Sequence, residues 1–263
     1  MPELPECEAA RKRIAAGALN RTIEGFALGE VSHVELPTES ERKRLIGTQF
    51  TRTRRHGKYI FVGSVGGPWL HIHLGMSGSV RVMDTADPPA DYVRFTVEFE
   101  GGTCLHFRDP RKFGRIELVE DVDAFIADKE LGPDALEMGD NAFAEVIGKT
   151  RGAIKSALLS QKKLAGMGNL WADESLYRSG IDPETRADTL SSDRVQTLHK
   201  ELRHVLQAVV DTDAEYGQLP DAWLIHHRSD GDACTRCDGT ISKKTVGGRT
   251  SYFCPDHQVG TSQ

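Results

Sequence analysis

The pattern of apolar and polar positions changes character about halfway along the chain. Up to about Leu118 the apolar residues come in short runs broken by glycine, such as YIFVGSV, WLHIHLGMSGSVRV, VRFTVEF, TCLHF and RIELV. Their length, their alternation and their content of β-branched residues predict strand after strand. One helix-like stretch, residues 6–16, precedes them. The first half is therefore expected to form a β-sandwich or barrel-like domain.

From Asp121 onward the apolar residues follow the helical repeat instead. Five segments show it: VDAFIADKEL, NAFAEVIGKT, RGAIKSALLSQ, NLWADESLYRSG and SSDRVQTLHKELRHVLQAVV. The stretch LGPDALEMGDN, with its Gly, Pro and Asp, predicts a linker between two domains. The expected fold is α+β, with domain boundaries at residues 1–131, 132–225 and 226–263, the last being a short polar tail that carries cysteines.

The net charge of this 263-residue chain is −6, from 33 Lys plus Arg against 39 Asp plus Glu, but the charges are unevenly placed. Residues 42–58 hold seven basic side chains and no acid, and residues 108–115 hold four against one Asp. Such runs are typical of a solvated face or of a surface that binds nucleic acid. No run approaches the ~20 apolar residues of a membrane span, and no signal peptide is recognisable. We therefore expect no membrane association and a cytoplasmic protein, associated with the nucleoid if it is bacterial.

Three of the five cysteines lie in the last 30 residues and form the pattern C-x2-C-x16-C-x2-H with a histidine. Two close pairs of soft ligands, separated by enough chain for a hairpin, are typical of a tetrahedral structural site for one zinc ion. A disordered tail with chance spacing is the alternative. The predicted ligands are Cys234, Cys237, Cys254 and His257.

The segment between the two ligand pairs predicts two strands that turn at Gly247 and Gly248, which places Arg249 at or just after the tip. Cys7 and Cys104 stand alone in the sequence, and we expect them to be small buried residues.

The chain begins with MPELPECE, in which three carboxylates (Glu3, Glu6 and Glu8) are crowded together and two prolines bracket a leucine. The stretch is too charged for a signal peptide and is expected to be too rich in proline for a first helical turn. Acids at these positions could simply favour the N-terminus of the helix that follows. If these residues formed only a frayed terminus, any polar sequence would serve in their place.

Seven short segments converge on one family. In chain order they are PELPE, RRHGKY, HLGMSG, FRDPRKFG, LGPDAL, GMGNLWADE and the cysteine-bearing hairpin with Arg249 in its turn. Each is weakly specific alone, but the order runs over nearly the whole chain. In these segments the chain resembles the formamidopyrimidine-DNA glycosylase and endonuclease VIII family of base-excision repair enzymes, and its formamidopyrimidine branch more closely.

The resemblance implies a function for the unusual N-terminus. In this family the initiator methionine is removed, and the secondary amine of the new terminal proline, here Pro2, attacks C1′ of the damaged nucleotide. An α-amino group has a pKa of about 7.7 to 8.0 and is nucleophilic near neutrality. The resulting iminium permits β-elimination, and the sequence leaves open whether δ-elimination follows. The resemblance further implies that Glu3 acts as acid and base at the sugar, that Glu6 and Glu174 line the same pocket, and that Lys58 contacts the phosphate near the lesion.

The resemblance also implies how damaged double-stranded DNA is held. His73, Asn169 and Arg249 match phosphate contacts of the family, and Lys155 is a weaker match of the same kind. Residues 154–179 resemble its helix-two-turns-helix element. A second group would fill the hole left by the flipped base, with a flexible thioether, a planar cation and an aromatic wedge. That group consists of Met76, Arg111 and Phe113.

The chain departs from the family pattern at three places. Only DTDAEYGQLPDAWLIHHRSDGDA separates the long helix from the finger, whereas 8-oxoguanine enzymes carry a longer glycine-containing loop there. The sequence therefore does not predict 8-oxoguanine as the preferred lesion. Tyr92 stands where the family more often has histidine, and His257 stands for the usual fourth cysteine.

The leading hypothesis is a bifunctional DNA glycosylase and abasic-site lyase that acts as a monomer and carries one structural zinc ion. A catalytically idle lesion-binding protein with a zinc finger is the main alternative. A metal-dependent nuclease is a weaker one, because no Asp, Glu and His cluster at metal spacing occurs outside the finger.

Overall fold

The computed structural model describes residues 1–30, 34–88 and 90–260. The chain divides into two compact units, Met1–Glu130 and Leu131–Gln263. Among the described residues, no helix is long and apolar enough to cross a membrane.

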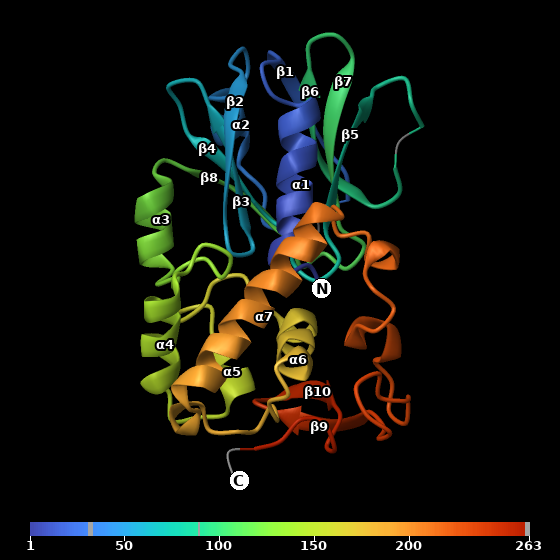
Figure 1. Ribbon diagram of the computed structural model, residues 1–263. Helices are drawn as coiled ribbons and strands as arrows, with labels where there is room; N and C mark the ends of the chain where they lie inside the picture. Colours follow the sequence, from blue (N-terminus) through green and yellow to red (C-terminus); the bar gives the residue numbers. More distant parts are fainter. Residues whose placement is uncertain (31–33, 89, 261–263) are drawn as a thin grey trace. The chain divides into compact units, whose positions relative to one another are not determined.

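The first unit contains two four-stranded antiparallel sheets (Figure 1). One sheet has the order β1-β6-β7-β5, made of Ile23–Leu28, Val93–Phe99, Thr103–Arg108 and Ser79–Asp84. The other has the order β2-β3-β4-β8, made of Phe50–His56, Tyr59–Ser64, Trp69–His73 and Arg115–Val119. Side chains from both sheets meet in a single apolar core, including Phe95, Phe107, Ile60 and Ile72. The predicted β-sandwich is confirmed.

The apolar run WLHIHLGMSGSVRV supplies strands to both sheets. Its first part is β4 and its last part is β5, and the chain turns between them. Gly75 has a φ of +61°, a left-handed conformation that favours glycine, and the Gly78 N–H donates to the Leu74 carbonyl at 2.8 Å. A run that resembles one long strand in the sequence therefore crosses from one sheet to the other.

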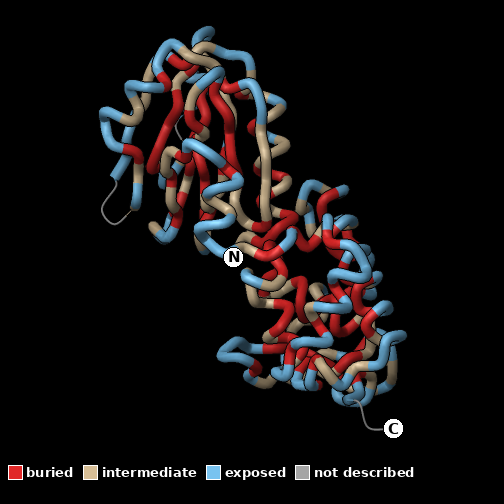
Figure 2. The backbone as a smooth tube through the Cα atoms, turned by 90° about the vertical axis from the view of Figure 1, so that its left-hand side faces the viewer, coloured by how far each residue is buried: buried red, intermediate tan, exposed pale blue. Residues whose placement is uncertain are grey.

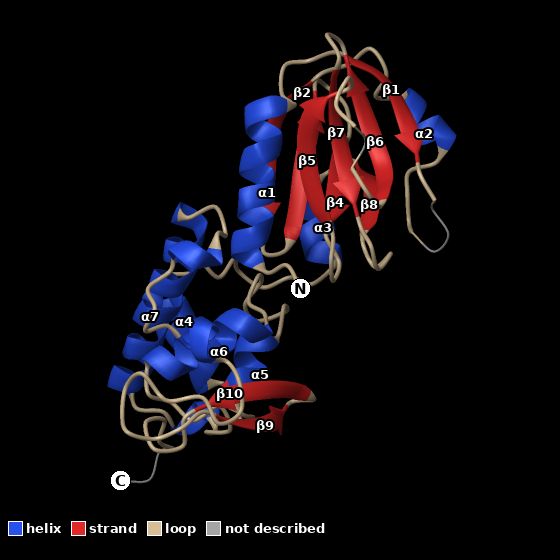
Figure 3. Ribbon diagram, turned by 90° about the vertical axis from the view of Figure 1, so that its right-hand side faces the viewer, coloured by secondary structure: helices blue, strands red, loops and turns tan. Residues whose placement is uncertain are grey.

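Helix α1 (Leu4–Gly17) begins earlier than the sequence predicted, because its first turn accepts a proline. Pro5 lies in that turn, where a backbone N–H would have no partner within the helix. The Glu3 N–H donates to Glu6 Oε2 at 2.7 Å, which completes the helix start. Leu4 and Ile14 are buried, and α1 lies beside β5 (Figure 3). The expectation that MPELPE is too proline-rich for a first helical turn is wrong.

Two short helices complete the first unit. Helix α2 (Glu39–Lys43) is capped by Thr38, and α3 (Val122–Asp128) is capped by Asp121, whose side chain accepts from the Ala124 N–H. Both caps satisfy N–H groups that the first helical turn leaves free.

The second unit is built around helix α6 (Asn169–Arg178), whose central residues Trp171 to Tyr177 are all buried. Figure 2 shows buried backbone, in red, running through the interior of each unit. Helices α4 (Asp140–Gly148), α5 (Ile154–Leu159) and α7 (Ser192–Asp211) pack around it or against one another. Single turns of 3₁₀ helix lie at Ala187–Thr189, Tyr216–Gln218 and Leu224–His227. The five predicted helical segments therefore give α3 in the first unit and α4 to α7 in the second.

The second unit ends in a hairpin of β9 (Ser242–Val246) and β10 (Arg249–Phe253). Gly247 and Gly248 form its two-residue turn, with φ of +57° and +74°. Two successive positive φ values are what a two-residue hairpin turn of the favoured type requires. The predicted hairpin and the position of Arg249 just after its tip are confirmed.

The segment predicted as a linker is instead part of the second unit. Ala135 and Met138 are buried, and the Ala135 N–H donates to the Ala165 carbonyl at 2.9 Å. A side chain at Gly132 would lie 2.6 Å from the backbone of Lys163, so the chain approaches too closely there for any other residue. The stretch LGPDALEMGDN therefore starts directly at the boundary between the two units, but it is packed into the second unit, and Gly132 permits its close approach to Lys163.

Candidate functional site

The predicted catalytic residues of the first unit gather at the start of α1. Pro2 directly precedes the helix, the Glu3 side chain is buried, and the Glu6 carboxylate holds the Glu3 N–H. The next turn of the helix reaches β2, since Glu8 Oε2 pairs with Arg55 Nε at 3.0 Å. Glu6 thus has the capping role that the sequence left open, whereas Glu8 forms an ion pair.

Lys58 lies in the turn between β2 and β3, next to this helix start. The Cys7 thiol contacts the Lys58 carbonyl at 3.4 Å. Burial, followed by the charge of Glu6, raises the pKa of Cys7 to about 12, so this thiol is not a nucleophile near neutrality. As predicted, Cys7 and Cys104 are buried. The structure thus brings Lys58 close to the acidic N-terminus of α1.

His73 lies at the same end of the sheet, because it pairs in the ladder with Tyr59, the residue after Lys58. The Gly75 N–H donates to His73 Nδ1 at 3.1 Å. That contact requires the tautomer with its hydrogen on Nε2. Burial, together with the positive charge of Lys58 and other neighbours, lowers the pKa of His73 to about 4. A neutral imidazole with an Nε2–H group can donate to a phosphate oxygen.

Met76, Arg111 and Phe113 lie on two loops that the structure joins. The buried Asp109 carboxylate accepts from Ser77 Oγ at 2.7 Å and from the Gly114 N–H at 2.7 Å. Asp109 also accepts the Arg111 N–H, which further fixes the turn.

A side chain at Gly75 would lie 2.5 Å from the backbone of Phe113, so the two loops touch at this point. Met76 and Phe113 are 37% and 57% exposed, and the Arg111 guanidinium lies 5.3 Å from the centre of the Phe113 ring. The exposed trio is therefore one surface feature. Asp109 and Ser77, which organise it, were not singled out from the sequence although both lie within the quoted motifs.

In the second unit, Asn169 and Arg249 lie near one backbone carbonyl. Asn169 is the first residue of α6, and its side-chain amide donates to the Thr250 carbonyl at 2.9 Å. Arg249 is the exposed residue next to Thr250 in β10. The N-terminus of α6 also presents backbone N–H groups that favour an anion.

Lys155 is the one predicted phosphate contact whose position opposes that role. Its side chain is fully buried, lies 2.7 Å from Asp173 Oδ1 and donates to the Thr250 carbonyl at 3.0 Å. A buried ammonium already paired with a buried carboxylate is not available to a phosphate in this arrangement. Lys155 therefore forms an internal ion pair next to Asn169 and the hairpin, and not the expected direct contact with a phosphate.

Glu174 is buried and holds a turn of backbone. Its two carboxylate oxygens accept the N–H groups of Leu224 and Ile225 at 3.2 Å and 3.0 Å. Burial raises the pKa of Glu174 to about 7, and the two N–H bonds only partly oppose this shift. The pKa of this carboxyl group is thus shifted toward neutrality, the range that suits general acid-base catalysis.

This pKa makes a testable contribution to stability. Because the folded pKa lies above the value of about 4.3 in an unfolded chain, the folded state binds the extra proton between these values, and stability falls as the pH rises. Between pH 5 and pH 8 the difference in free energy of unfolding between wild type and Glu174→Gln is expected to fall by roughly 2 kcal/mol. Urea titrations at both pH values measure it, and a difference independent of pH would contradict the shifted pKa.

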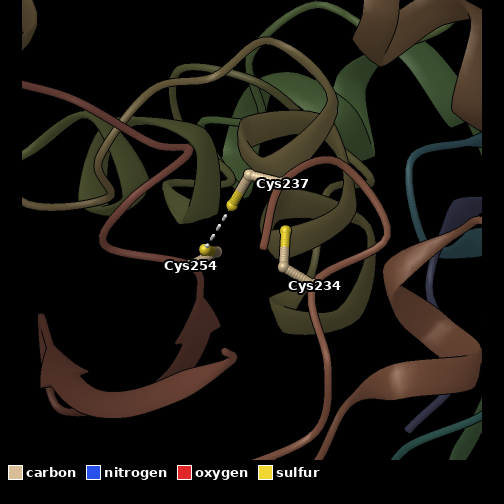
Figure 4. A group of neighbouring side chains, drawn as sticks. All are labelled: Cys234, Cys237 and Cys254. Atoms are coloured by element: carbon tan, nitrogen blue, oxygen red, sulfur yellow. Dashed lines mark hydrogen bonds between the residues drawn. The ribbon is translucent and has the colours of Figure 1, made fainter. Parts of the chain in front are cut away.

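Three cysteines of the second unit form a cluster (Figure 4). The sulfur atoms of Cys234, Cys237 and Cys254 all lie within 4.8 Å of one another, and those of Cys237 and Cys254 are 3.6 Å apart. Backbone N–H groups of Arg236 and Gly239 point at two of these sulfur atoms, at 3.4 Å and 3.3 Å. Three thiols within reach of one point, with N–H donors that favour thiolates, fit a metal ion.

His257 is not part of this cluster. Its Nε2 lies 2.8 Å from the carbonyl of Tyr177, and its ring packs edge-on against the Tyr177 ring. A metal-bound histidine commonly donates its other ring N–H to a backbone carbonyl, which would leave Nδ1 as the ligand atom here. Ligation by His257 stays a prediction, because the structure groups only the three cysteines.

Comparisons with known proteins agree with this arrangement. Residues 1–116 match the model of the formamidopyrimidine-DNA glycosylase N-terminal domain, and residues 131–220 match that of the formamidopyrimidine-DNA glycosylase H2TH domain. The formamidopyrimidine-DNA glycosylase of Chloroflexus aurantiacus is 33% identical, over 100% of this chain and 99% of its own length. That of Bacillus subtilis is 31% identical, over 98% and 99%.

Solved structures show the same likeness. The Lactococcus lactis formamidopyrimidine-DNA glycosylase, bound non-covalently to DNA with an abasic site, has a TM-score of 0.86 at 28% identity, over 97% of this chain and 99% of that one. MutM in complex with DNA containing carbocyclic 8-oxoguanine has a TM-score of 0.88 at 28% identity, over 98% and 99%. The folds and motifs are those of a DNA glycosylase. The chain belongs to the formamidopyrimidine-DNA glycosylase family.

Proposed function

We propose that the protein is a bifunctional DNA glycosylase and abasic-site lyase that removes oxidised or ring-opened bases from double-stranded DNA. One observation carries the proposal: Pro2 directly precedes α1 and is followed by the buried Glu3, and Lys58 contacts Cys7 in the first turns of the same helix. An amine, a carboxyl group and a cation around the start of one helix supply the chemistry of imine formation.

The reaction follows from these groups. After removal of Met1, the lone pair of the Pro2 nitrogen attacks C1′, the bond from C1′ to the damaged base breaks, and the base leaves with a proton. Glu3 protonates the sugar ring oxygen as the ring opens. The resulting iminium draws electrons from the C2′–H bond, so a base can remove that proton while the 3′ phosphate leaves. Hydrolysis of the iminium then frees the enzyme.

Other groups bind and position the DNA. Lys58 and His73 lie together at one end of the sheet and would hold phosphates next to the reacting sugar. The exposed trio of Met76, Arg111 and Phe113 would occupy the space that the extruded nucleotide leaves.

The cysteine cluster has a structural function in this proposal. Cys234, Cys237 and Cys254, with His257 as the fourth ligand, would hold a zinc ion. Bound zinc would fix the ends of the β9-β10 hairpin and thereby the position of Arg249, and a closed four-ligand site supplies no reaction chemistry.

Borohydride trapping tests the proposal. The mature protein is incubated with duplexes that contain 8-oxoguanine, a formamidopyrimidine, an oxidised pyrimidine or an abasic site, and the reduced covalent adduct is measured. We expect adducts with at least one damaged base and with the abasic site, unchanged by EDTA in the assay. A protein that binds these duplexes but forms no adduct would be the idle lesion-binding alternative, and mass spectrometry would then be expected to show Met1 retained.

The exposed trio gives a second test. Replacing Arg111 by alanine removes the cation that would hydrogen-bond the orphaned base, so we expect affinity for lesion duplexes to fall about 10-fold and discrimination between opposite bases to weaken. Adduct yield on a single-stranded abasic site should stay unchanged. Arg81→Ala, which removes an exposed arginine from β5, is the control. Equal effects on single- and double-stranded substrates would contradict the assignment.

A further inference from the structure

The Asp173 carboxylate has four partners within the second unit, although the proposed reaction assigns it no role. Oδ1 lies 2.7 Å from Lys155 Nζ and accepts from Ser251 Oγ at 2.8 Å. Oδ2 accepts from Arg228 Nη2 at 2.6 Å and from the Tyr252 N–H at 3.2 Å. The side chains of Asp173 and Lys155 are both 0% exposed.

These partners come from separate segments of the unit. Lys155 lies on α5, Asp173 on α6, Arg228 just after the 3₁₀ turn at Leu224–His227, and Ser251 and Tyr252 on β10. Figure 1 shows α6 directly above the hairpin that β9 and β10 form. A single buried carboxylate therefore joins two helices and a loop to one strand of the hairpin.

The bonds from Asp173 reach β10 close to Arg249, one of the predicted phosphate contacts. They hold Ser251 and Tyr252, which follow Arg249 and Thr250 in the strand. The Thr250 carbonyl, between the exposed Arg249 and the anchored Ser251, accepts from both Lys155 and Asn169. The anchored stretch thus fixes Arg249 relative to Asn169 at the N-terminus of α6.

The charges of the cluster explain why a carboxylate is needed. Two cations, Lys155 and Arg228, approach Asp173, and Arg228 also lies over the Tyr252 ring at 4.6 Å from its centre. Without the carboxylate, Lys155 would be a buried ammonium that has lost the charge of Asp173, which is strongly unfavourable. A buried ionic cluster can hold one arrangement against others in which the hairpin packs differently, since only one geometry satisfies every member.

We infer that Asp173 is a positioning residue that holds Arg249 and Asn169 in the one arrangement able to clamp a single DNA phosphate. This inference rests on the proposed function, because it takes Asn169 and Arg249 as phosphate contacts. Asp173 itself is buried and touches no DNA. Its effect is exerted through the β10 backbone and through the orientation of Lys155.

The test is a double-mutant cycle on binding. Affinity for a duplex with a tetrahydrofuran abasic analogue, which cannot be cleaved through C1′, is measured for wild type, Asp173→Asn, Arg249→Ala and the double variant. Asparagine keeps the volume but removes the charge, so we expect a loss of about 10-fold. Because Asp173 acts through Arg249, the double variant should bind nearly as well as Arg249→Ala alone. Independent effects that multiply, or wild-type affinity of Asp173→Asn, would overturn the inference.

Two controls make the outcome specific. Asp182 pairs with Lys244 of β9 at 2.8 Å, so Asp182→Asn also removes a carboxylate that bonds to the hairpin. This variant should leave DNA affinity unchanged. Zinc content and thermal unfolding show whether each variant is folded. If Asp173→Asn does not fold, Ser251→Ala, which removes one neutral bond to the carboxylate, decides by the same cycle. Ser251→Ala should lower DNA affinity less than Asp173→Asn does. It should cause no further loss of affinity when Arg249→Ala is also present.

Failure of this inference differs from failure of the proposed function. A wild-type protein that neither binds the analogue nor forms a borohydride adduct contradicts the proposed function. A wild type that does both, with an Asp173→Asn variant of equal affinity, contradicts only the role of Asp173.

Discussion

Replacing Pro2 by glycine is expected to lower the rate of borohydride-trappable adduct formation about 100-fold, the order of loss that misplacing a reacting group produces. Proline supplies a secondary amine, which gives a permanently charged iminium, whereas glycine supplies a primary amine whose imine must be protonated before it draws electrons. The proline ring also fixes the direction of the nitrogen lone pair ahead of Glu3, and glycine loses this restraint. Single-turnover trapping on an abasic duplex measures the change.

Binding separates this chemical effect from a loss of structure. Pro2 precedes α1, whose buried residues begin at Glu3 and Leu4, so the glycine variant should fold and should bind the tetrahydrofuran duplex with unchanged affinity. An adduct formed at the wild-type rate would show that the secondary amine of proline is not required. Peptide mapping of the reduced adduct would then decide between the α-amine of residue 2 and Lys58, which lies near the same helix start.

Replacing Cys237 by serine is expected to abolish zinc retention and to lower DNA affinity at least about 100-fold. Structural zinc contributes about 10 to 16 kcal/mol to the folding of small finger peptides, and a short hairpin cannot replace that contribution from its own apolar core. Loss of the hairpin would free Arg249 and remove the partners of Asp173 on β10. Zinc stoichiometry and binding to the tetrahydrofuran duplex measure the two effects.

The matched control is Cys104→Ser, because Cys104 is a buried thiol of β7 outside the cluster. That variant should keep one zinc ion per chain. His257→Ala is expected to weaken retention, since only water would remain for the fourth position. Full zinc retention by Cys237→Ser would contradict the site, and full retention by His257→Ala would remove His257 from the ligand set.

Much of the architecture followed from local pattern. Short apolar runs predicted the strands of the sandwich, the helical repeat predicted α4 to α7, and paired glycines predicted the hairpin turn. These features are set by interactions between residues close in the chain, which a pattern of side chains records directly. The error at MPELPE has a local cause. Proline breaks helices in general, but a first helical turn tolerates it.

The residues of the candidate site also fall into two groups, those that the sequence predicted and those that only the structure revealed. Pro2, Glu3, Lys58 and the cysteine spacing could be identified from the sequence because each belongs to a short motif with chemical meaning. Asp109 and Asp173 could not, although both lie within motifs, because their function is to bond segments far apart in the chain. Lys155 carried a misleading signal for the same reason: a lysine in a DNA-binding motif indicates a phosphate contact until its buried partner is known.

The sequence by itself determined the family and the three cysteines of the cluster, and it predicted the chemistry at the N-terminus, since these depend on residue identity and order. Only the tertiary structure decided which of these side chains are exposed and which are buried and hold the others in place. The difference is physical: a carboxylate's partners, and hence its burial and its pKa, come from segments brought together by folding. Glu174 shows this most clearly, because an ordinary acid in the sequence becomes a group that titrates near neutrality.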